Sequence, residues 1–383
     1  MLAGLALSVP AMADQGSCHK SQIRTAAGCT RIAAARREVQ RIVNQDFRQN
    51  DLRAVLGRVD VGGRTLATFS PGQSMAGVPA TLRMHFRIGS IAIPYLIDVL
   101  LQLQDRHRLS LDDPISKWFP QLPNANRVTL RMLASATSGY PDWIQGNPSF
   151  QAALLANPFR QWKTQQLLDI ALARPIVCDP GACFHYAHTG FVILGDLLQK
   201  VTGQSLGRLL HRRVLRPLGL RHTEISSLPA IPDPVLHAYL NFRGPYEDST
   251  YWSASWGISQ SLTMTSTIGD AIKSAKALET GALVSKSASR QRIAPITAGF
   301  HPFSASLYYG LGVDVAGGWQ VQNPVLNGWS SIMATLPSRR IALALSVTLG
   351  QNAVNSETNF SERLLRELTQ YLTPNHVAAL PDA

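Results

Sequence analysis

The sequence predicts an α+β fold in which strands near the two ends of the chain share one antiparallel sheet. Strand-like periodicity is found at 53–69 and again at 306–349, whereas the stretch from about 88 to 285 is mostly helical with Pro/Gly turns. Helix-forming segments at 31–48 and 356–372 flank the strands and can pack on the sheet. The helical stretch then forms a second lobe, and a cleft is expected between the two.

The first elements are a helix and a hairpin. Apolar residues at Ile32, Val39, Ile42 and Val43 favour one buried helix face within 31–48. Val55, Val59 and Val61 precede Gly62-Gly63, and Leu66, Ala67 and Phe69 follow it. This pattern predicts two strands joined by a tight turn.

The later elements follow the same rules. Residues 91–103 are apolar nearly all round, which predicts a buried helix. A second helix is expected over 189–202, with Thr189 as its cap and Gly203 as its end. Further strands are expected at 306–315, 319–323, 329–336 and 340–349, followed by a helix over 356–372 that begins at Ser356. The segment IALALSVTL suits a central strand because it is apolar on both faces.

Composition narrows the function classes. The 383 residues are 45% hydrophobic and 16% charged, which supports a large core and argues against disorder. The formal charge of +12 favours anionic partners such as cell-envelope polymers. The basic residues are scattered and no nucleic-acid-binding motif is present, so we expect a basic surface without nucleic-acid binding. No metal or organic cofactor is implied.

The N-terminus and the cysteines indicate export. Residues 1–13 end in Ala-Met-Ala and resemble a signal peptide, which predicts a secreted or periplasmic, envelope-located protein. No other stretch reaches ~18 uninterrupted apolar residues, so no transmembrane helix is expected. The even count of four cysteines predicts two disulfides, and we favour Cys18–Cys29 and Cys178–Cys183 among three connectivities. Their spacings match no zinc pattern.

Long local phrases resemble one family. FRIGSIAI (86–93) is similar to the nucleophile segment of the serine β-lactamase (class C), D-Ala-D-Ala carboxypeptidase and esterase superfamily. Further similar phrases are LSLDDPISKWFPQLPNANRVTLRMLASATSGYPDW (109–143), PGACFHYAHTGFVILGDLLQKVTGQSL (180–206), RVLRPLGLRHT (213–223) and NGWSSIMATLP (327–337). The resemblance implies a β-lactamase/DD-peptidase-like fold in a serine hydrolase domain over 35–372.

The resemblance also implies domain limits. The α/β lobe would comprise 35–85 and 290–372, and the helical lobe 86–289. An N-terminal segment over 14–34 precedes the domain, and a tail over 373–383 follows it.

The family chemistry needs a serine nucleophile, a lysine three residues later, a Tyr-x-Asn motif and a Lys-Thr-Gly or His-x-Gly strand. Here Ser90 stands at the nucleophile position, but Ile93 replaces the lysine and cannot accept a proton. Tyr186 stands at the motif tyrosine, and His188 replaces the asparagine. The strand triplet is Gln-Asn-Pro at 322–324. We therefore select Ser90, Tyr186 and His188 as candidate catalytic residues.

Three functions remain open. The first is an impaired member of the family that binds peptidoglycan-like or acyl ligands without efficient turnover. The second is an active carboxypeptidase, esterase or amidase in which His188 forms a dyad with Ser90, because an imidazole suits the role of a base near neutral pH. The third is a non-catalytic structural or interaction protein of the envelope. Small pocket changes decide the substrate, so the fold does not choose among lactam, ester and D-amino-acid peptide.

Overall fold

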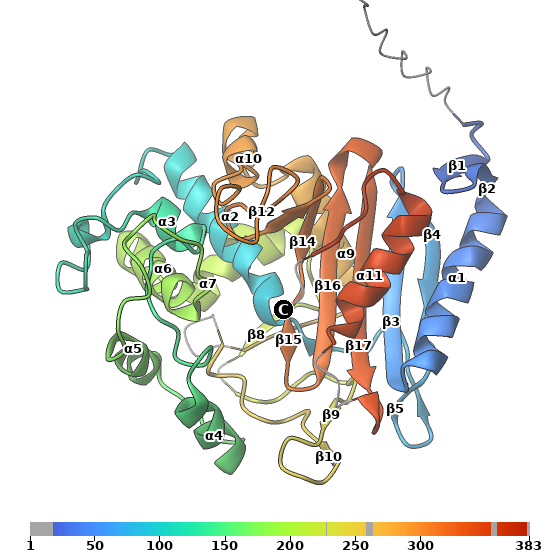
Figure 1. Cartoon of the computed structure of the whole chain (residues 1–383), viewed down its shortest axis with the longest axis horizontal. Helices are drawn as coiled ribbons and strands as arrows, with labels where there is room; N and C mark the ends of the chain where they lie inside the picture. Colours follow the sequence, from blue (N-terminus) through green and yellow to red (C-terminus); the bar gives the residue numbers. More distant parts are fainter. Residues whose placement is uncertain (1–17, 227, 258–262, 354–357, 381–383) are drawn as a thin grey trace, which may run out of the picture.

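The computed structural model describes residues 18–226, 228–257, 263–353 and 358–380 (Figure 1). Its α-helices are α1 (Ile32–Gln49), α2 (Ala92–Asp105), α3 (Leu130–Ala134), α4 (Pro148–Ala156), α5 (Thr164–Leu172), α6 (His188–Thr202), α7 (Leu206–Leu210), α8 (Arg216–Leu218), α9 (Ile268–Thr280), α10 (Lys286–Arg292) and α11 (Phe360–Leu372). Short turns of other helix types are η1 (Gly89–Ile91), η2 (Ile115–Lys117), η3 (His211–Leu215) and η4 (Pro337–Arg339). The predicted signal peptide, 1–13, lies outside the described residues.

The strands are β1 (Gln22–Thr25), β2 (Gly28–Arg31), β3 (Leu52–Val61), β4 (Arg64–Phe69), β5 (Gln73–Met75), β6 (Val78–Pro79), β7 (Phe86–Arg87), β8 (Glu224–Ser226), β9 (Tyr239–Leu240), β10 (Glu247–Asp248), β11 (Thr263–Ser266), β12 (Leu307–Tyr309), β13 (Asp314–Ala316), β14 (Trp319–Gln322), β15 (Val325–Leu326), β16 (Trp329–Leu336) and β17 (Ile341–Leu349). The main sheet has the order β12-β13-β14-β16-β17-β3-β4, with β15 paired to β16. Every pairing in this sheet is antiparallel. Strands from both ends of the chain thus form one sheet, which confirms the predicted α+β class.

The sheet is covered on both faces, which explains the apolar run in β17. Leu343 and Leu345 of β17 pack with residues of α1 and α11 in one core. Ala342 and Ala344, on the opposite face, belong to the core of the helical part of the chain. Side chains alternate between the faces of a strand, so a strand buried on both sides is apolar at every position. Figure 1 shows α11 in front of β16 and β17, with α1 beside the β3–β4 edge.

The helical part is organised around α2. All twelve residues from Ala92 to Leu103 are buried, as the uninterrupted apolar sequence predicts. Its first residues follow η1, whose preceding strand β7 pairs with β11 in a small sheet of order β7-β11-β8. No helix in the part of the chain that the structure describes is long and apolar enough to cross a bilayer.

Several predicted elements differ in detail. The expected strand 306–315 is two strands, β12 and β13, because the chain turns back on itself, with the Gly310 N–H donating to the Val313 carbonyl. Thr189 does not cap α6, since its hydroxyl donates to the Pro141 carbonyl at 2.6 Å. Gly203 does end α6, with φ +67°. The helix expected over 356–372 is α11, which begins at Phe360 and is capped by Asn359; residues 356 and 357 lie outside the described residues.

Both expected disulfides form. Cys18–Cys29 lies beside the β1–β2 hairpin, which contacts α11 through a hydrogen bond from the Ala26 N–H to the Tyr371 carbonyl. Cys178–Cys183 closes a loop of the helical part. Nearest-neighbour pairing is therefore confirmed for both, and the second bridge lies three residues before Tyr186.

Candidate active site

Ser90 lies where the small sheet ends and α2 begins. The Ile88 N–H donates to the Met264 carbonyl, which fixes the chain just before the serine. Gly89 has φ +46°, and a Cβ on it would lie 2.7 Å from the Pro324 side chain. A side chain at 89 would therefore be strained and would collide with the neighbouring strand. These constraints hold Ser90 at the boundary between the main sheet and the helical part.

Pro94 is accommodated in the first turn of α2. The preceding turn, η1, ends with the Ala92 N–H donating to the carbonyls of Gly89 and Ser90. The α-helix begins only at Ala92, so Pro94 occupies a position whose N–H would have no intrahelical partner. Pro94 therefore breaks no hydrogen bond within α2.

Ile93 fills the place where the family has its lysine. The side chain is 0% exposed and contacts the backbone of Gly312, where a Cβ would lie 2.7 Å from Ile93 Cγ2. Among the described residues no lysine amine is hydrogen-bonded to Ser90. A hydrocarbon side chain, packed in the core, therefore stands in place of the proton acceptor.

Tyr186 is the direct partner of the serine. The two hydroxyl oxygens, Ser90 Oγ and Tyr186 Oη, are 3.0 Å apart. Burial raises the pKa of Tyr186 well above its ordinary value. The hydrogen bond with Ser90 lowers this pKa, and the negative charges of Asp142 and Asp314 raise it further. A buried lysine ammonium would lower this pKa, and no cation among the described residues does so. The phenol therefore stays protonated at neutral pH and is a poor base.

Backbone pairing between two loops carries Tyr186 to the serine. The N–H groups of Val177, Gly181 and His185 donate to carbonyls in the segment 136–139. Gly139 has φ +75°, and a Cβ there would lie 2.0 Å from the Cys178 carbonyl oxygen. The close approach requires glycine and, with the Cys178–Cys183 bridge, holds the loop before α6 in place.

His188 is held by a buried carboxylate. Its ring Nδ1 lies 2.8 Å from Asp142 Oδ2, and its backbone N–H donates to the same oxygen at 2.5 Å. The Asp142 side chain is 0% exposed and that of His188 is 12% exposed. If Nδ1 carries the proton donated to Asp142, Nε2 is left as an acceptor, as in other carboxylate–histidine pairs.

Asp142 is charged and rigidly held. Burial raises the pKa of Asp142. Four contributions outweigh burial and lower the pKa to about 2: the charge of His188, its hydrogen bond, and the hydrogen bonds from the N–H groups of Gln145 and Ile144. The Arg174 guanidinium donates to the carbonyls of Asp142, Gln145 and Gly146, which locks the loop around the carboxylate. The next residue, Trp143, is 0% exposed and packs in the core.

The three residues of the altered strand triplet, 322–324, contact other parts of the fold. Gln322 donates its side-chain amide to the Gly312 carbonyl at 2.7 Å, and Asn323 donates to Glu362 Oε1 at 2.7 Å. Pro324 packs on Gly89, and its carbonyl accepts from the Ser331 N–H at 2.9 Å. Pro324 lies outside β14, where its missing N–H breaks no ladder bond.

The fold thus brings together all three residues selected from the sequence, in two pairs. Ser90 is hydrogen-bonded to Tyr186, and His188 to Asp142; the rings of Tyr186 and His188 meet edge to face with centroids 5.5 Å apart. No direct hydrogen bond joins Ser90 to His188 within the described ranges. Asp142 as a partner of the histidine was not recognised from the sequence, where it was only part of the family-like phrase 109–143.

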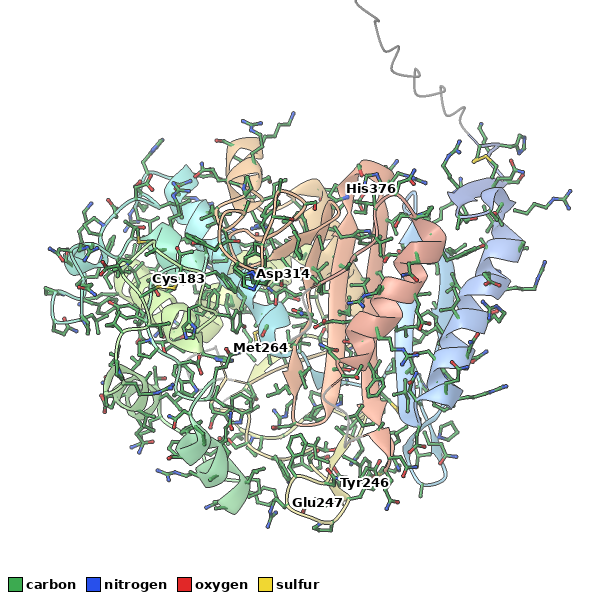
Figure 2. All side chains as sticks on the ribbon, in the orientation of Figure 1. Cys183, Tyr246, Glu247, Met264, Asp314 and His376 are labelled. Atoms are coloured by element: carbon green, nitrogen blue, oxygen red, sulfur yellow. A yellow bond between two sulfur atoms is a disulfide. The ribbon has the colours of Figure 1, made fainter. Side chains whose placement is uncertain are left out.

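A further carboxyl group, Asp314 of β13, was also missed from the sequence. Figure 2 shows it between the main sheet and the helical part. Burial first, and the negative charge of Glu362 second, raise its pKa to about 7. The ionised form adds to the forces that raise the Tyr186 pKa.

Asp314 makes stability depend on pH. Its folded-state pKa exceeds the unfolded value, so the group stabilises the fold below pH ~4 and this contribution is lost as pH rises to about 7. We expect Asp314→Asn to remove this loss. The melting temperature of the variant minus that of wild type should therefore be larger at pH 8 than at pH 4, by at least about 2 °C. Thermal melts at both pH values measure this. Asp179→Asn, at an exposed carboxylate, is the control; equal pH slopes for wild type and Asp314→Asn would contradict the assignment.

Comparisons with known proteins show the family of the chain. The chain matches the β-lactamase family model over residues 43–366. It is 22% identical over 262 residues to a penicillin-binding protein of Bacillus subtilis (strain 168), covering 64% of this chain and 54% of that protein. It is also 27% identical over 183 residues to the esterase EstB of Burkholderia gladioli, covering 45% of this chain and 44% of the esterase. The chain thus spans about half the length of these relatives.

Solved structures agree over a larger share of the chain. A D-stereospecific amidohydrolase from a Streptomyces species superposes with a TM-score of 0.72 at 26% identity, covering 86% of this chain and 97% of the other. A D-amino acid amidase from Ochrobactrum anthropi SV3 has the same fold, with a TM-score of 0.75 at 23% identity and coverage of 88% and 98%. The family match spans most of the chain and includes Ser90 and Tyr186, so this protein belongs to the β-lactamase family.

Proposed function

We propose that this chain is an envelope-located member of the β-lactamase family that binds amide or ester ligands, peptidoglycan-like peptides or other acyl compounds, without efficient turnover. The observation that carries the proposal is the surroundings of Ser90: a buried Ile93 one turn away and a hydrogen bond to a tyrosine whose pKa burial raises. A serine hydroxyl without a base keeps its proton near neutral pH. Loss of a general base alone costs ~10²–10⁴-fold in rate.

The envelope location is supported by the two disulfides, which persist in oxidising compartments. The formal charge of +12 supports a contact with anionic envelope polymers. A relative in Escherichia coli (strain K12) is named as a D-alanyl-D-alanine-carboxypeptidase/endopeptidase, which supports a ligand with a peptide or amide group.

A second function, hydrolysis through His188, is favoured by one observation. The Asp142–His188 hydrogen bond of 2.8 Å supplies what a catalytic histidine requires, a fixed tautomer and orientation. In this arrangement the Ser90 proton would pass to Tyr186 as the phenol proton passes to His188 Nε2, because Ser90 bonds Tyr186 and not the imidazole. Such a relay would need the Tyr186 hydroxyl and the imidazole to approach each other.

Acylation distinguishes the two. Wild-type protein is incubated with a fluorescent penicillin or a fluorophosphonate, and the intact mass is measured over hours beside Ser90→Ala and a lysine-bearing penicillin-binding protein as positive control. We expect no stoichiometric adduct on the wild type. The test variant His188→Asn restores the family residue and keeps a donor toward Asp142. An adduct that needs Ser90 and disappears in this variant would overturn the proposal in favour of the His188 mechanism.

A further inference from the structure

A cavity of about 730 Å³ is formed by the β1–β2 hairpin, the β3–β4 turn and residues next to η4 and α11. This volume is typical of small-molecule sites. Figure 1 shows the hairpin beside α1, at the end of the molecule opposite the helical part. Ser90, Tyr186 and His188 are not in the lining, so the cavity is separate from the candidate active site.

The charged residues of the lining are all cationic. Lys20, Arg24, Arg64 and Arg339 line the cavity, and no acidic residue is found among the described residues of the lining. The side chains of Lys20, Arg64 and Arg339 form no ion pair or hydrogen bond with another described residue. A concave site lined by one sign of charge focuses its field, and the like charges repel one another. An anion bound there would relieve this repulsion.

The walls that carry the cations are held by the fold itself. The hairpin is closed by the Cys18–Cys29 bridge and hydrogen-bonded to α11. On the other side the Gly62 N–H donates to the Arg340 carbonyl at 2.8 Å, which ties the β3–β4 turn to the residue after Arg339. The backbone is therefore ordered before a ligand arrives, and less conformational entropy is lost on binding.

The same lining contains aliphatic side chains that are only half-buried. These are Ile23 of β1, Ile32 of α1 and Val61 of β3. The aliphatic stems of the arginines add further apolar surface. An inorganic ion would leave these side chains in contact with water, whereas an anion with a hydrocarbon part would cover them and gain free energy from their burial.

We propose that this cavity binds a phosphate monoester whose organic part is aliphatic. Three of the four cations are guanidinium groups, whose planar fork of N–H donors matches the oxygens of a phosphate. A phosphate monoester carries a charge of about −1.5 to −2 at pH 7 and therefore offsets more positive charge than a carboxylate does. Such a group occurs in free alkyl or glycerol phosphates and in the headgroup of phosphatidic acid.

A series of three anions tests the ligand class. Inorganic phosphate, hexyl phosphate and hexyl sulfate are titrated calorimetrically into the full chain. Hexyl phosphate should bind at least about tenfold more tightly than inorganic phosphate, because its chain covers the aliphatic side chains. Hexyl sulfate has the same chain but a single charge and should bind at least about fivefold more weakly than hexyl phosphate. Equal Kd values within either pair would overturn the corresponding part of the proposal.

Variants of the lining locate the site. Arg64→Gln and Arg339→Gln should each weaken hexyl phosphate binding at least about tenfold, the effect of losing a charged hydrogen bond. Arg290→Gln removes the same charge from an exposed position of α10 outside the lining and should leave binding unchanged. The melting temperatures of the two lining variants should equal or exceed that of wild type, because neither side chain has a described partner to lose. Equal weakening in all three variants would show non-specific attraction and overturn the site.

The two sources of the phosphate group are separated by co-sedimentation with phosphatidylcholine vesicles that contain or lack phosphatidic acid. Retention that needs phosphatidic acid and is lost in Arg64→Gln would identify a lipid headgroup as the ligand. Saturable binding of hexyl phosphate without retention would identify a soluble ester. Neither measurement depends on acylation of Ser90, so this proposal and the proposed function fail separately. Absence of both retention and saturable hexyl phosphate binding would overturn the proposal.

Discussion

Restoring the lysine should raise the acylation rate of Ser90 by at least about 10²-fold, the contribution typical of a general base. The variant is Ile93→Lys combined with His188→Asn, which returns these two side chains to the family's residues and leaves the triplet 322–324 unchanged. Position 93 is 0% exposed, so the amine would be desolvated and its pKa lowered, as in lysines that act as bases. When protonated, the same group would lower the raised pKa of Tyr186.

The rate is measured as adduct formation with a fluorescent penicillin by intact mass. Ile93→Met with His188→Asn is the matched control, because methionine is unbranched and apolar and cannot accept a proton. The unbranched lysine also lacks the Cγ2 methyl that packs against Gly312. If the lysine variant folds like the control but is acylated no faster, the missing lysine is not the main cause of slow acylation. The altered triplet Gln322–Pro324 would then be the main cause.

Breaking the buried ion pair between Asp98 of α2 and Arg292 of α10 should have the largest effect on stability. The Arg292 guanidinium donates to the Asp98 carboxylate, and the two side chains are 3% and 8% exposed, respectively. Burial raises the pKa of Asp98, and the Arg292 charge and hydrogen bond oppose this. Arg292→Met leaves an uncompensated buried carboxylate, so we expect the free energy of unfolding to fall by ~3–5 kcal/mol.

Urea unfolding of Arg292→Met, Asp98→Leu and the double variant measures this effect. The double variant should be more stable than Arg292→Met, since it removes the orphaned charge as well. The deficit of Arg292→Met should shrink as pH falls, because protonation neutralises an Asp98 whose folded-state pKa is raised. A loss below ~1 kcal/mol in either single variant would place this pair among ion pairs of little consequence.

Much of the architecture follows from local sequence. Helix α1, the β3–β4 hairpin, β17 and α2 match their predicted ranges within a few residues, because each depends on its own periodicity of apolar residues or on Gly62-Gly63. The small sheet of β7, β8 and β11 was not predicted. Its strands are two to four residues long, and they pair across long stretches of chain, β7 (86–87) with β11 (263–266) and β8 (224–226) with β11, so no local period reveals them.

The sequence alone determined the family and the loss of the lysine, because each depends on which residue stands at a given position. It left three disulfide connectivities open, and the structure decided among them. Only the tertiary structure decided the partners of the site residues. Ser90 meets Tyr186 across 96 positions, and His188 meets Asp142 across 46. Hydrogen bonds form only within about 3.5 Å, and that proximity is set by how the packed loops and strands converge, which no spacing along the chain encodes.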